Sequence, residues 1–210
     1  MRPLGKVKIE WCTNFAYAIG LITTDGNLST DGRHINFTSK DLELVQIFRK
    51  CLYLNNKIGK KARGGGREKK YYVVQLGDKN FYNFLLSIGL MPAKSKRLDN
   101  LLIPAQYFPD FLRGCIDGDG NINTFKHPES RHPQLRVRLY SASPLFLDWV
   151  YRTVKEKFSL KGGWIETRED LSTLAYAKTD AIQLLRLLYY SKTVFCLRRK
   201  QALAEQFLRV

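Results

Sequence analysis

The stretch FLRGCIDGDGNI, residues 111–122, joins an apolar helical pattern directly to two acidic residues, Asp117 and Asp119. The carboxyl end of a helix carries partial negative charge, so carboxylates are unfavourable there unless a positive group joins them. The same arrangement occurs earlier in the chain, where FAYAIGLITTDGNL, residues 15–28, ends a helical pattern at Asp25. The chain therefore contains two helices that each run into an Asp-Gly pair, and this repetition decides the fold.

The residues that follow the two acidic helix ends repeat the same order of elements. After Asp25 the hydrophobic periodicity predicts two strands, a helix, two more strands and a further helix, and the same order returns after Asp119. Each half therefore has the pattern α-β-β-α-β-β-α. We predict an α+β fold made of two pseudosymmetric repeats, residues 1–98 and 99–210.

Small residues recur at every fourth position of both acidic helices, which gives each helix one narrow face. Such faces let two helix backbones approach closely. If the repeats pack about a pseudo-twofold axis along these faces, Asp25 and Asp119 lie side by side at one end of the helix pair. The small residues are Ala16, Gly20, Thr24, Gly114 and Gly118.

Two carboxylates placed side by side at two helix C-termini repel each other and are pushed toward protonation unless a cation joins them. A hard divalent cation meets this need, and Mg²⁺ is suited to a few carboxylates completed by water and phosphate oxygens. Either Asp25 or Asp119 taken alone reads as an ordinary Asp-Gly turn at the end of a helix. Taken together on duplicated helices, they favour a metal site.

The charge of the chain points to a polyanionic partner. Its 210 residues contain 35 Lys and Arg against 19 Asp and Glu, which gives a net charge of +16. Nucleic acid is the leading partner, ahead of an acidic membrane surface. No apolar run approaches the roughly 18 residues of a spanning helix. The N-terminal residues lack the apolar core of a secretory signal, and the four cysteines form no CxxC pair, so we expect reduced, buried thiols and an intracellular location, in a bacterial cytoplasm or an organelle.

The segments AIGLITTDG, residues 18–26, and LRGCIDGDG, residues 112–120, both resemble the nine-residue signature of the LAGLIDADG homing endonucleases. Two copies in one chain resemble the single-chain, two-motif, monomeric branch of that family. The resemblance implies a saddle of two antiparallel sheets that straddles DNA in the major groove, with the two motif helices packed at the central interface.

The resemblance also implies roles for individual residues. Asp25 and Asp119 match the acid that binds the catalytic metal. Thr24 and Gly118 match the preceding positions, whose backbone carbonyls can join the metal shell. Asp117 keeps the first acid of the motif, which is not the main ligand in the family, and we expect it to lie outside the primary metal shell or to face solvent.

The motifs depart from the family pattern at a few positions. Thr23 replaces the first acid in the first copy, while Arg113 and Cys115 replace an alanine and a leucine in the second. These departures leave the packing around the second helix open and do not touch the metal site.

A basic residue in the family reaches toward the scissile phosphates from the region after the third helix of each repeat. Lys94 and Lys192 occupy that region here, with Lys96 as an alternative to Lys94. We therefore assign Lys94 and Lys192 as catalytic candidates on the strength of the resemblance.

Basic and aromatic residues along the predicted strands are candidates for contacts with DNA bases or phosphates. For any single one, a solvated polar sheet face explains the pattern equally well, and only the total charge favours DNA. The histidines at 34, 127 and 132 read as solvated, and the tryptophans at 11, 149 and 164 read as packing residues. The DNA-binding candidates are Lys60, Arg63, Arg67, Lys69, Tyr71, Arg136 and Arg138.

The hypothesis from sequence is a site-specific, double-strand DNA endonuclease that acts as a monomer on a long asymmetric target. The resemblance implies Mg²⁺, with Mn²⁺ or Ca²⁺ as substitutes in the site, and products with short 3′ overhangs. No splicing-junction residues suggest an intein, so an intron-encoded or free-standing enzyme is expected. Two rivals are an RNA maturase that assists intron splicing and a DNA-binding protein of the same fold that does not cleave.

Overall fold

The computed structural model describes residues 5–62, 68–126 and 133–208. Three of the seven α-helices in these residues belong to a first α-β-β-α-β-β-α series, and four follow it. The first series comprises α1 (Thr13–Asp25), β1 (Gly26–Leu28), β2 (His34–Ser39), α2 (Leu42–Cys51), β3 (Gly59–Lys61), β4 (Tyr71–Gly77) and α3 (Lys79–Ser87). Two short 3-10 helices, η1 (Lys94–Lys96) and η2 (Ala105–Tyr107), connect it to the second series. That series comprises α4 (Phe108–Asp119), β5 (Gly120–Phe125), β6 (Gln134–Ser141), α5 (Pro144–Phe158), β7 (Trp164–Thr167), β8 (Ser172–Ala177), α6 (Lys178–Leu188) and α7 (Arg198–Leu208).

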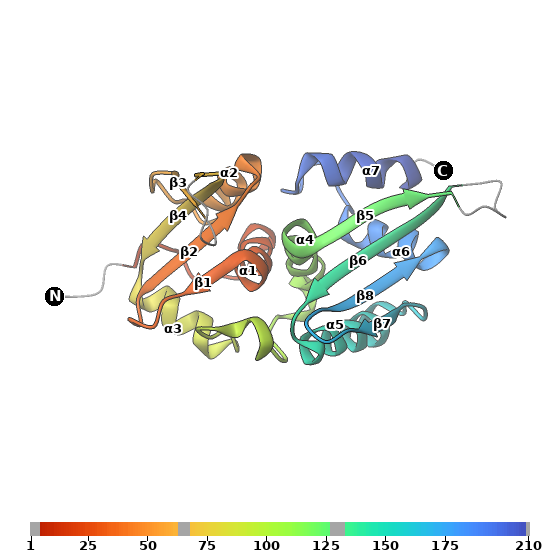
Figure 1. The fold of residues 1–210 in the computed structure, drawn as a ribbon, viewed down its shortest axis with the longest axis horizontal. Coiled ribbons are helices and arrows are strands. Elements are labelled where there is room, and N and C mark those ends of the chain that lie inside the picture. Colours follow the sequence, from red (N-terminus) through yellow and green to blue (C-terminus); the bar gives the residue numbers. More distant parts are fainter. Residues whose placement is uncertain (1–4, 63–67, 127–132, 209–210) are drawn as a thin grey trace.

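The strands form two four-stranded antiparallel sheets with equivalent topology. The orders are β1-β2-β4-β3 and β5-β6-β8-β7. In both central strands every second residue is buried, so that Ile35 and Phe37 of β2 and Val137 and Leu139 of β6 point into the core. The helices α1 and α4 lie at the centre, with one sheet on each side (Figure 1). The predicted α+β fold of two pseudosymmetric repeats is therefore confirmed. The division of the chain between residues 98 and 99 falls in the connection after η1 and stays a prediction.

The helices α1 and α4 touch backbone to backbone through glycines. A Cβ added to Gly20 would lie 2.1 Å from the carbonyl oxygen of Phe111. A Cβ added to Gly114 would lie 2.2 Å from the carbonyl oxygen of Tyr17. No side chain fits at either point, so the small-residue faces predicted from the sequence form the contact between the repeats.

Aromatic side chains fill the space around the N-terminal ends of this helix pair. Trp11 packs edge-on against Phe15, with ring centroids 5.5 Å apart, and Trp149 packs against Phe108 at 5.6 Å. These two tryptophans are packing residues, as predicted. The prediction for Trp164 was wrong, because this side chain lies on the outer face of the second sheet and is 37% exposed.

The cysteine prediction was wrong at one position. Cys51, Cys115 and Cys196 are buried, but Cys12 is exposed because it is the residue that precedes the first turn of α1. Within the described ranges, none of the helices has the length and apolar character needed to cross a membrane.

Replacing Gly114 by alanine tests the backbone contact between the two central helices. We expect Gly114→Ala to lower the free energy of unfolding by about 1–3 kcal/mol or more, because the new methyl group must force the two backbones apart. Chemical denaturation followed by circular dichroism measures this loss.

The matched control for this substitution is Gly59→Ala in β3. An added Cβ there meets nothing closer than a Val73 methyl at 3.5 Å, which is an ordinary contact. Its stability should stay unchanged or rise by about 0.4–1 kcal/mol through lost freedom of the unfolded chain. Equal effects of the two substitutions would contradict the close helix contact.

Candidate functional site

The acidic ends of the two central helices meet at one cavity. Asp25 and Asp119 are the last residues of α1 and α4, and both line a cavity of about 950 Å³ between the sheets. Asp25 is half-buried and Asp119 is exposed. A Cβ added to Gly118 would lie 3.3 Å from a carboxylate oxygen of Asp25, so the backbone of α4 passes directly beside this acid. The structure thus brings together Asp25, Asp119, Thr24 and Gly118.

Lys94 closes this site from the first repeat. Its side chain is 7% exposed, and its Nζ donates to the carbonyl oxygens of Gly26 at 2.6 Å and Thr24 at 3.3 Å. A positive group at this point compensates the partial negative charge of the α1 C-terminus. Of the two basic residues left open in the first repeat, Lys94 lies in the site, whereas Lys96 is exposed and pairs with Asp170 at 3.1 Å.

The corresponding place in the second repeat belongs to Lys200 and not to Lys192. Lys200 is 3% exposed, and its Nζ donates to the carbonyl oxygens of Ile116 at 2.5 Å, Gly120 at 2.7 Å and Asp117 at 3.0 Å. It therefore holds the end of α4 as Lys94 holds the end of α1. Lys192 is exposed in the segment between α6 and α7.

Burial lowers the pKa of Lys94 and Lys200, whereas the negative charges of Asp25 and Asp119 raise it. Burial lowers the pKa of Lys94 to about 8, while the negative charges of Asp119 and Asp25 oppose the shift. Burial lowers the pKa of Lys200 to about 8 as well, against the charges of Asp117, Asp119 and Asp25. The charges of both acids therefore influence the pKa of each lysine, and Lys94 also lines the cavity with them.

Asp117 does not face solvent, contrary to one of the two expectations from the sequence. Its side chain is 1% exposed and accepts hydrogen bonds from the hydroxyl of Tyr17 at 2.7 Å and the backbone N–H of Leu197 at 2.7 Å. Tyr189 donates a longer bond to it at 3.4 Å. Burial raises the pKa of Asp117, and these bonds oppose the shift. Asp117 thus attaches the segment before α7 to the end of α4.

Arg113 makes a similar attachment at the middle of α4. Its guanidinium is fully buried, pairs with Asp110 at 2.7 Å, and donates to the carbonyl oxygens of Leu188 at 2.8 Å and Phe195 at 2.9 Å. The arginine that replaces the small motif residue therefore binds the chain between α6 and α7. Because Lys200 follows that chain segment directly, Arg113 and Asp117 together set its position.

The strand register of the first sheet places Lys60 and its neighbour Lys61 on opposite faces. Lys60 pairs with Tyr72, and Tyr72 shares its face with the buried Val74 and Leu76. Lys60 therefore lies on the helix-covered side, with its Nζ 5.3 Å from the Tyr72 ring centroid. Lys61 pairs with Tyr71 on the opposite face and lines the cavity that holds the acids.

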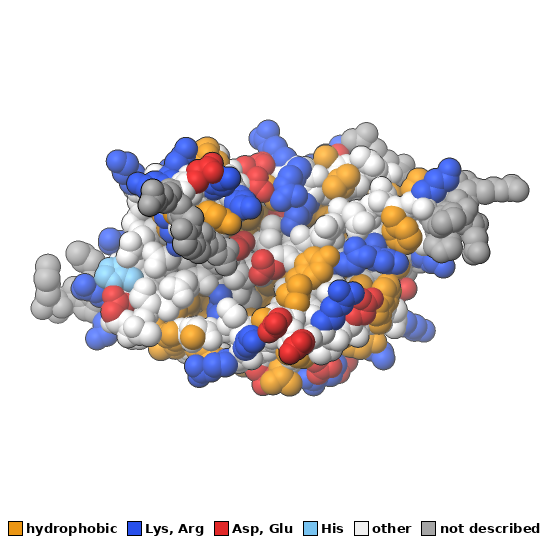
Figure 2. Space-filling model, in the orientation of Figure 1, with side chains coloured by type: hydrophobic (Ala, Val, Ile, Leu, Met, Phe, Trp, Pro, Cys, Tyr) orange, Lys and Arg blue, Asp and Glu red, His pale blue; other side chains and the backbone are white. Residues whose placement is uncertain are grey.

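The remaining candidates lie as follows. Lys69 is exposed just before β4, and Tyr71 is half-buried with the Lys40 Nζ 5.4 Å from its ring centroid. Arg136 and Arg138 share the outer face of the second sheet, where Arg138 donates to Asn123 at 3.1 Å. Figure 2 shows Lys and Arg side chains over this sheet and acidic side chains near the centre of the same view. Arg63, Arg67, His127 and His132 lie outside the described residues.

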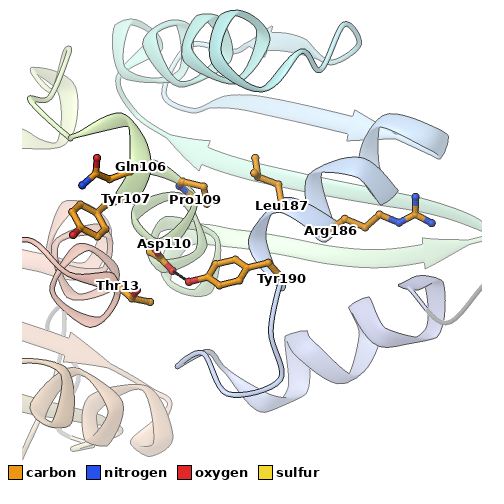
Figure 3. A pocket seen from close by; sticks show the side chains of 8 residues that line it. All are labelled: Thr13, Gln106, Tyr107, Pro109, Asp110, Arg186, Leu187 and Tyr190. Atoms are coloured by element: carbon orange, nitrogen blue, oxygen red, sulfur yellow. Dashed lines mark hydrogen bonds between the residues drawn. The ribbon is translucent and has the colours of Figure 1, made fainter.

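A second cavity, of about 520 Å³, lies at the opposite end of the helix pair (Figure 3). Asp110 and Tyr190 point toward each other there, and the tyrosine hydroxyl donates to the carboxylate at 2.9 Å. The same carboxylate oxygen accepts from Arg113, so this acid is already neutralised by a buried cation. The acidic end of the helix pair is therefore the better site for a metal ion.

The chain alone does not build a complete metal shell in the described ranges. They contain no group of three or more His, Cys, Asp or Glu side chains arranged to hold a cation. Two carboxylates beside two backbone carbonyls still fit a hard cation that takes the rest of its ligands from water and phosphate oxygens. The donors present are the side chains of Asp25 and Asp119 and the carbonyls of Thr24 and Gly118.

Comparison with known proteins relates this architecture to a family. Residues 13–89 match the family model described as a LAGLIDADG-like domain. No curated protein sequence matches the chain. Several solved structures share the fold, and at the identities given below they establish the fold alone.

Three of these structures, two of nucleases and one of DUF199/WhiA, are described here. A structure of the meganuclease I-SmaMI bound to uncleavable DNA has a TM-score of 0.60 and 11% identity, covering 93% of this chain and 90% of that chain. I-DmoI in complex with DNA and Ca has a TM-score of 0.57 and 18% identity, covering 92% and 97%. Full-length DUF199/WhiA from Thermatoga maritima has a TM-score of 0.57 and 12% identity, covering 98% and 67%.

Proposed function

For a chain that carries a LAGLIDADG-like domain at residues 13–89 and has the two-repeat LAGLIDADG fold, we propose a site-specific double-strand DNA endonuclease as the function. One observation carries the proposal above all others. Asp25 and Asp119, contributed by different repeats, line one cavity together with the buried Lys94, and a second buried lysine, Lys200, bonds to the end of α4. Because both acids come from one chain, we also propose that the protein acts as a monomer.

The donor set supports Mg²⁺ as the metal, held by the carboxylates of Asp25 and Asp119. The carbonyls of Thr24 and Gly118 are further donors, although the Thr24 carbonyl already accepts a hydrogen bond from Lys94. A bound Mg²⁺ would supply Lewis acidity toward a phosphodiester and positive charge for the negative charge that develops on phosphate oxygens. Structures of I-DmoI with DNA and Mn or with DNA and Ca agree with a divalent cation in this fold.

The protein groups have separate tasks in this proposal. Asp25 and Asp119 hold negative charge at the point where a phosphodiester enters the cavity. Lys94 and Lys200 fix the backbone around these acids and keep positive charge beside them, which limits their mutual repulsion. The two sheets and the overall charge of +16 bind the DNA on both sides of the cavity. DNA as substrate also makes an intracellular location part of the proposal.

The fold by itself does not decide between cleavage and binding, since homing endonucleases and DUF199/WhiA both share it. A DNA-binding protein that does not cleave and an RNA maturase are therefore the rivals. Neither rival requires acids from two repeats at one cavity. The retention of both acids, each with a lysine beside it, favours the endonuclease, and an intron-encoded origin stays a prediction.

Replacing either acid by its amide tests the cleavage mechanism. We expect Asp25→Asn and Asp119→Asn each to reduce cleavage of a target duplex by about 10²-fold or more, because each removes a charge on which phosphate chemistry depends. Single-turnover cleavage in Mg²⁺ measures the rate, and gel-shift titration in Ca²⁺ measures DNA binding, which should remain.

The matched control is Asp99→Asn, since Asp99 is an exposed acid outside the cavity. It should cleave at the rate of the parent protein. Normal cleavage by either Asp25→Asn or Asp119→Asn would refute the two-acid mechanism. Loss of DNA binding in the same variants would instead indicate that the acids serve folding or docking.

Two lysine substitutions test the place assigned to Lys200. We expect Lys200→Met to slow cleavage by about 10–100-fold, the usual effect of losing a partner that orients the groups of a metal site. Lys192→Met should change the rate by less than about twofold, since an exposed surface substitution is usually neutral. Single-turnover rates on the same duplex, with folding checked by circular dichroism, compare the two. A larger effect at Lys192 would return the role to that residue.

A further inference from the structure

An arginine on the outer face of the second sheet lies close to two aromatic rings. The guanidinium carbon of Arg136 is 4.5 Å from the centroid of the Phe125 ring and 5.8 Å from that of the Trp164 ring. The three side chains come from β6, β5 and β7, so they reach across the whole width of the sheet. We call this group the arginine cassette.

The sequence of β8 explains how side chains from β6 and β7 meet. This strand lies between them and places Ala177 opposite Arg136 and Ala175 opposite Trp164. Two methyl groups leave the space above β8 open, so the guanidinium and the indole approach each other across it. Larger residues at these two positions would separate them.

Further contacts fix the cassette in place. The indole N–H of Trp164 donates to the carboxylate of Glu166 at 2.7 Å, which orients the ring. The Nε of Arg136 is shielded from solvent and has no hydrogen-bond partner. The two aromatic rings are therefore the contacts that hold the guanidinium in place.

If the second sheet lies against the major groove, as the proposed function implies, a guanidinium held by neighbouring rings matches one base edge in particular. Guanine presents two acceptors, O6 and N7, and an arginine that donates to both is the commonest specific contact in that groove. We propose that Arg136 recognises a guanine in the half of the target that lies under the second sheet, and that Phe125, Trp164 and Glu166 position it. This inference rests on the proposed DNA-binding function and goes beyond it by naming the base.

The outer face of the first sheet has different side chains, with His34 at the position equivalent to Arg136 and Asn36 at the position equivalent to Arg138. The register puts Asn27 opposite Asn36 and Asn36 opposite Gln75, all on the outer face. Amide side chains match adenine best, because they can donate to N7 and accept from the N6 amino group. The outer faces of the two sheets therefore carry different side chains, and the guanine contact proposed for Arg136 belongs to the half under β5–β8.

Selection of bound duplexes from a randomised double-stranded DNA library, with Ca²⁺ in place of Mg²⁺, tests this inference. The parent protein should enrich a site with an invariant guanine in one half. Arg136→Ala should relax that one position, lowering the preference for guanine by about 5- to 150-fold, as expected when a two-acceptor contact is lost. Arg136→Lys should relax it too, because lysine keeps the charge without the fork of donors.

Two further variants separate positioning from structure. Trp164→Leu should weaken the guanine preference in part, and Trp164→Phe should restore it, because phenylalanine keeps a ring beside the guanidinium. Gln75→Ala on the other sheet is the control and should leave that guanine unchanged. Circular dichroism checks folding, and if Arg136→Ala does not fold, Arg136→Lys decides.

The outcomes separate this inference from the proposed function. Enrichment of the same guanine by parent and both Arg136 variants would overturn the role of Arg136 and leave site-specific DNA binding intact. If the parent protein enriches a site that has no guanine in either half, the role of Arg136 is likewise overturned and site-specific binding stands. Failure of the parent protein to enrich any sequence would overturn both proposals.

Discussion

The contact between the backbones of α1 and α4 determines where everything else in the site can lie. Gly20 and Gly114 allow the two helices to touch there without side chains between them, and Gly118 lets the Thr24 side chain pack against the backbone near the end of α4. Asp25 and Asp119 close these helices and therefore meet at one cavity. A bulkier interface would separate the acids and remove the shared site without changing either motif's last two residues.

Bringing two carboxylates to two helix C-termini is costly, and the chain compensates with buried cations. Lys94 and Lys200 donate to carbonyls in the last turns of α1 and α4 respectively, and also to the first carbonyl of the strand that follows each helix. The position of Lys200 depends on two further contacts. Arg113 and Asp117 hold the segment that precedes α7, the helix on which Lys200 lies. Arg113, which departs from the motif, and Asp117, which is not a primary metal ligand in the family, therefore both help to position Lys200.

Much of this arrangement could be predicted from the sequence, and the exceptions have physical reasons. The alternation of apolar residues predicts the strands, and the glycine spacing predicts the helix contact, because both are local patterns. The burial of Lys200 could not be predicted, because it lies in a run of basic residues that is typical of a solvent-exposed helix face. Only tertiary packing buries it. Trp164 and the face of Lys60 depend on cross-strand register, which a single strand's sequence does not contain.

We propose that Asp25 and Asp119, one from each repeat, bind a divalent cation beside a phosphate of the DNA backbone. Anomalous diffraction from crystals of the protein grown with its selected target duplex and Mn²⁺ tests this most directly. We expect anomalous peaks between the carboxylates of Asp25 and Asp119, next to a backbone phosphate. Peaks bound elsewhere, or a complex in which these two carboxylates point away from each other and from the DNA, would contradict it.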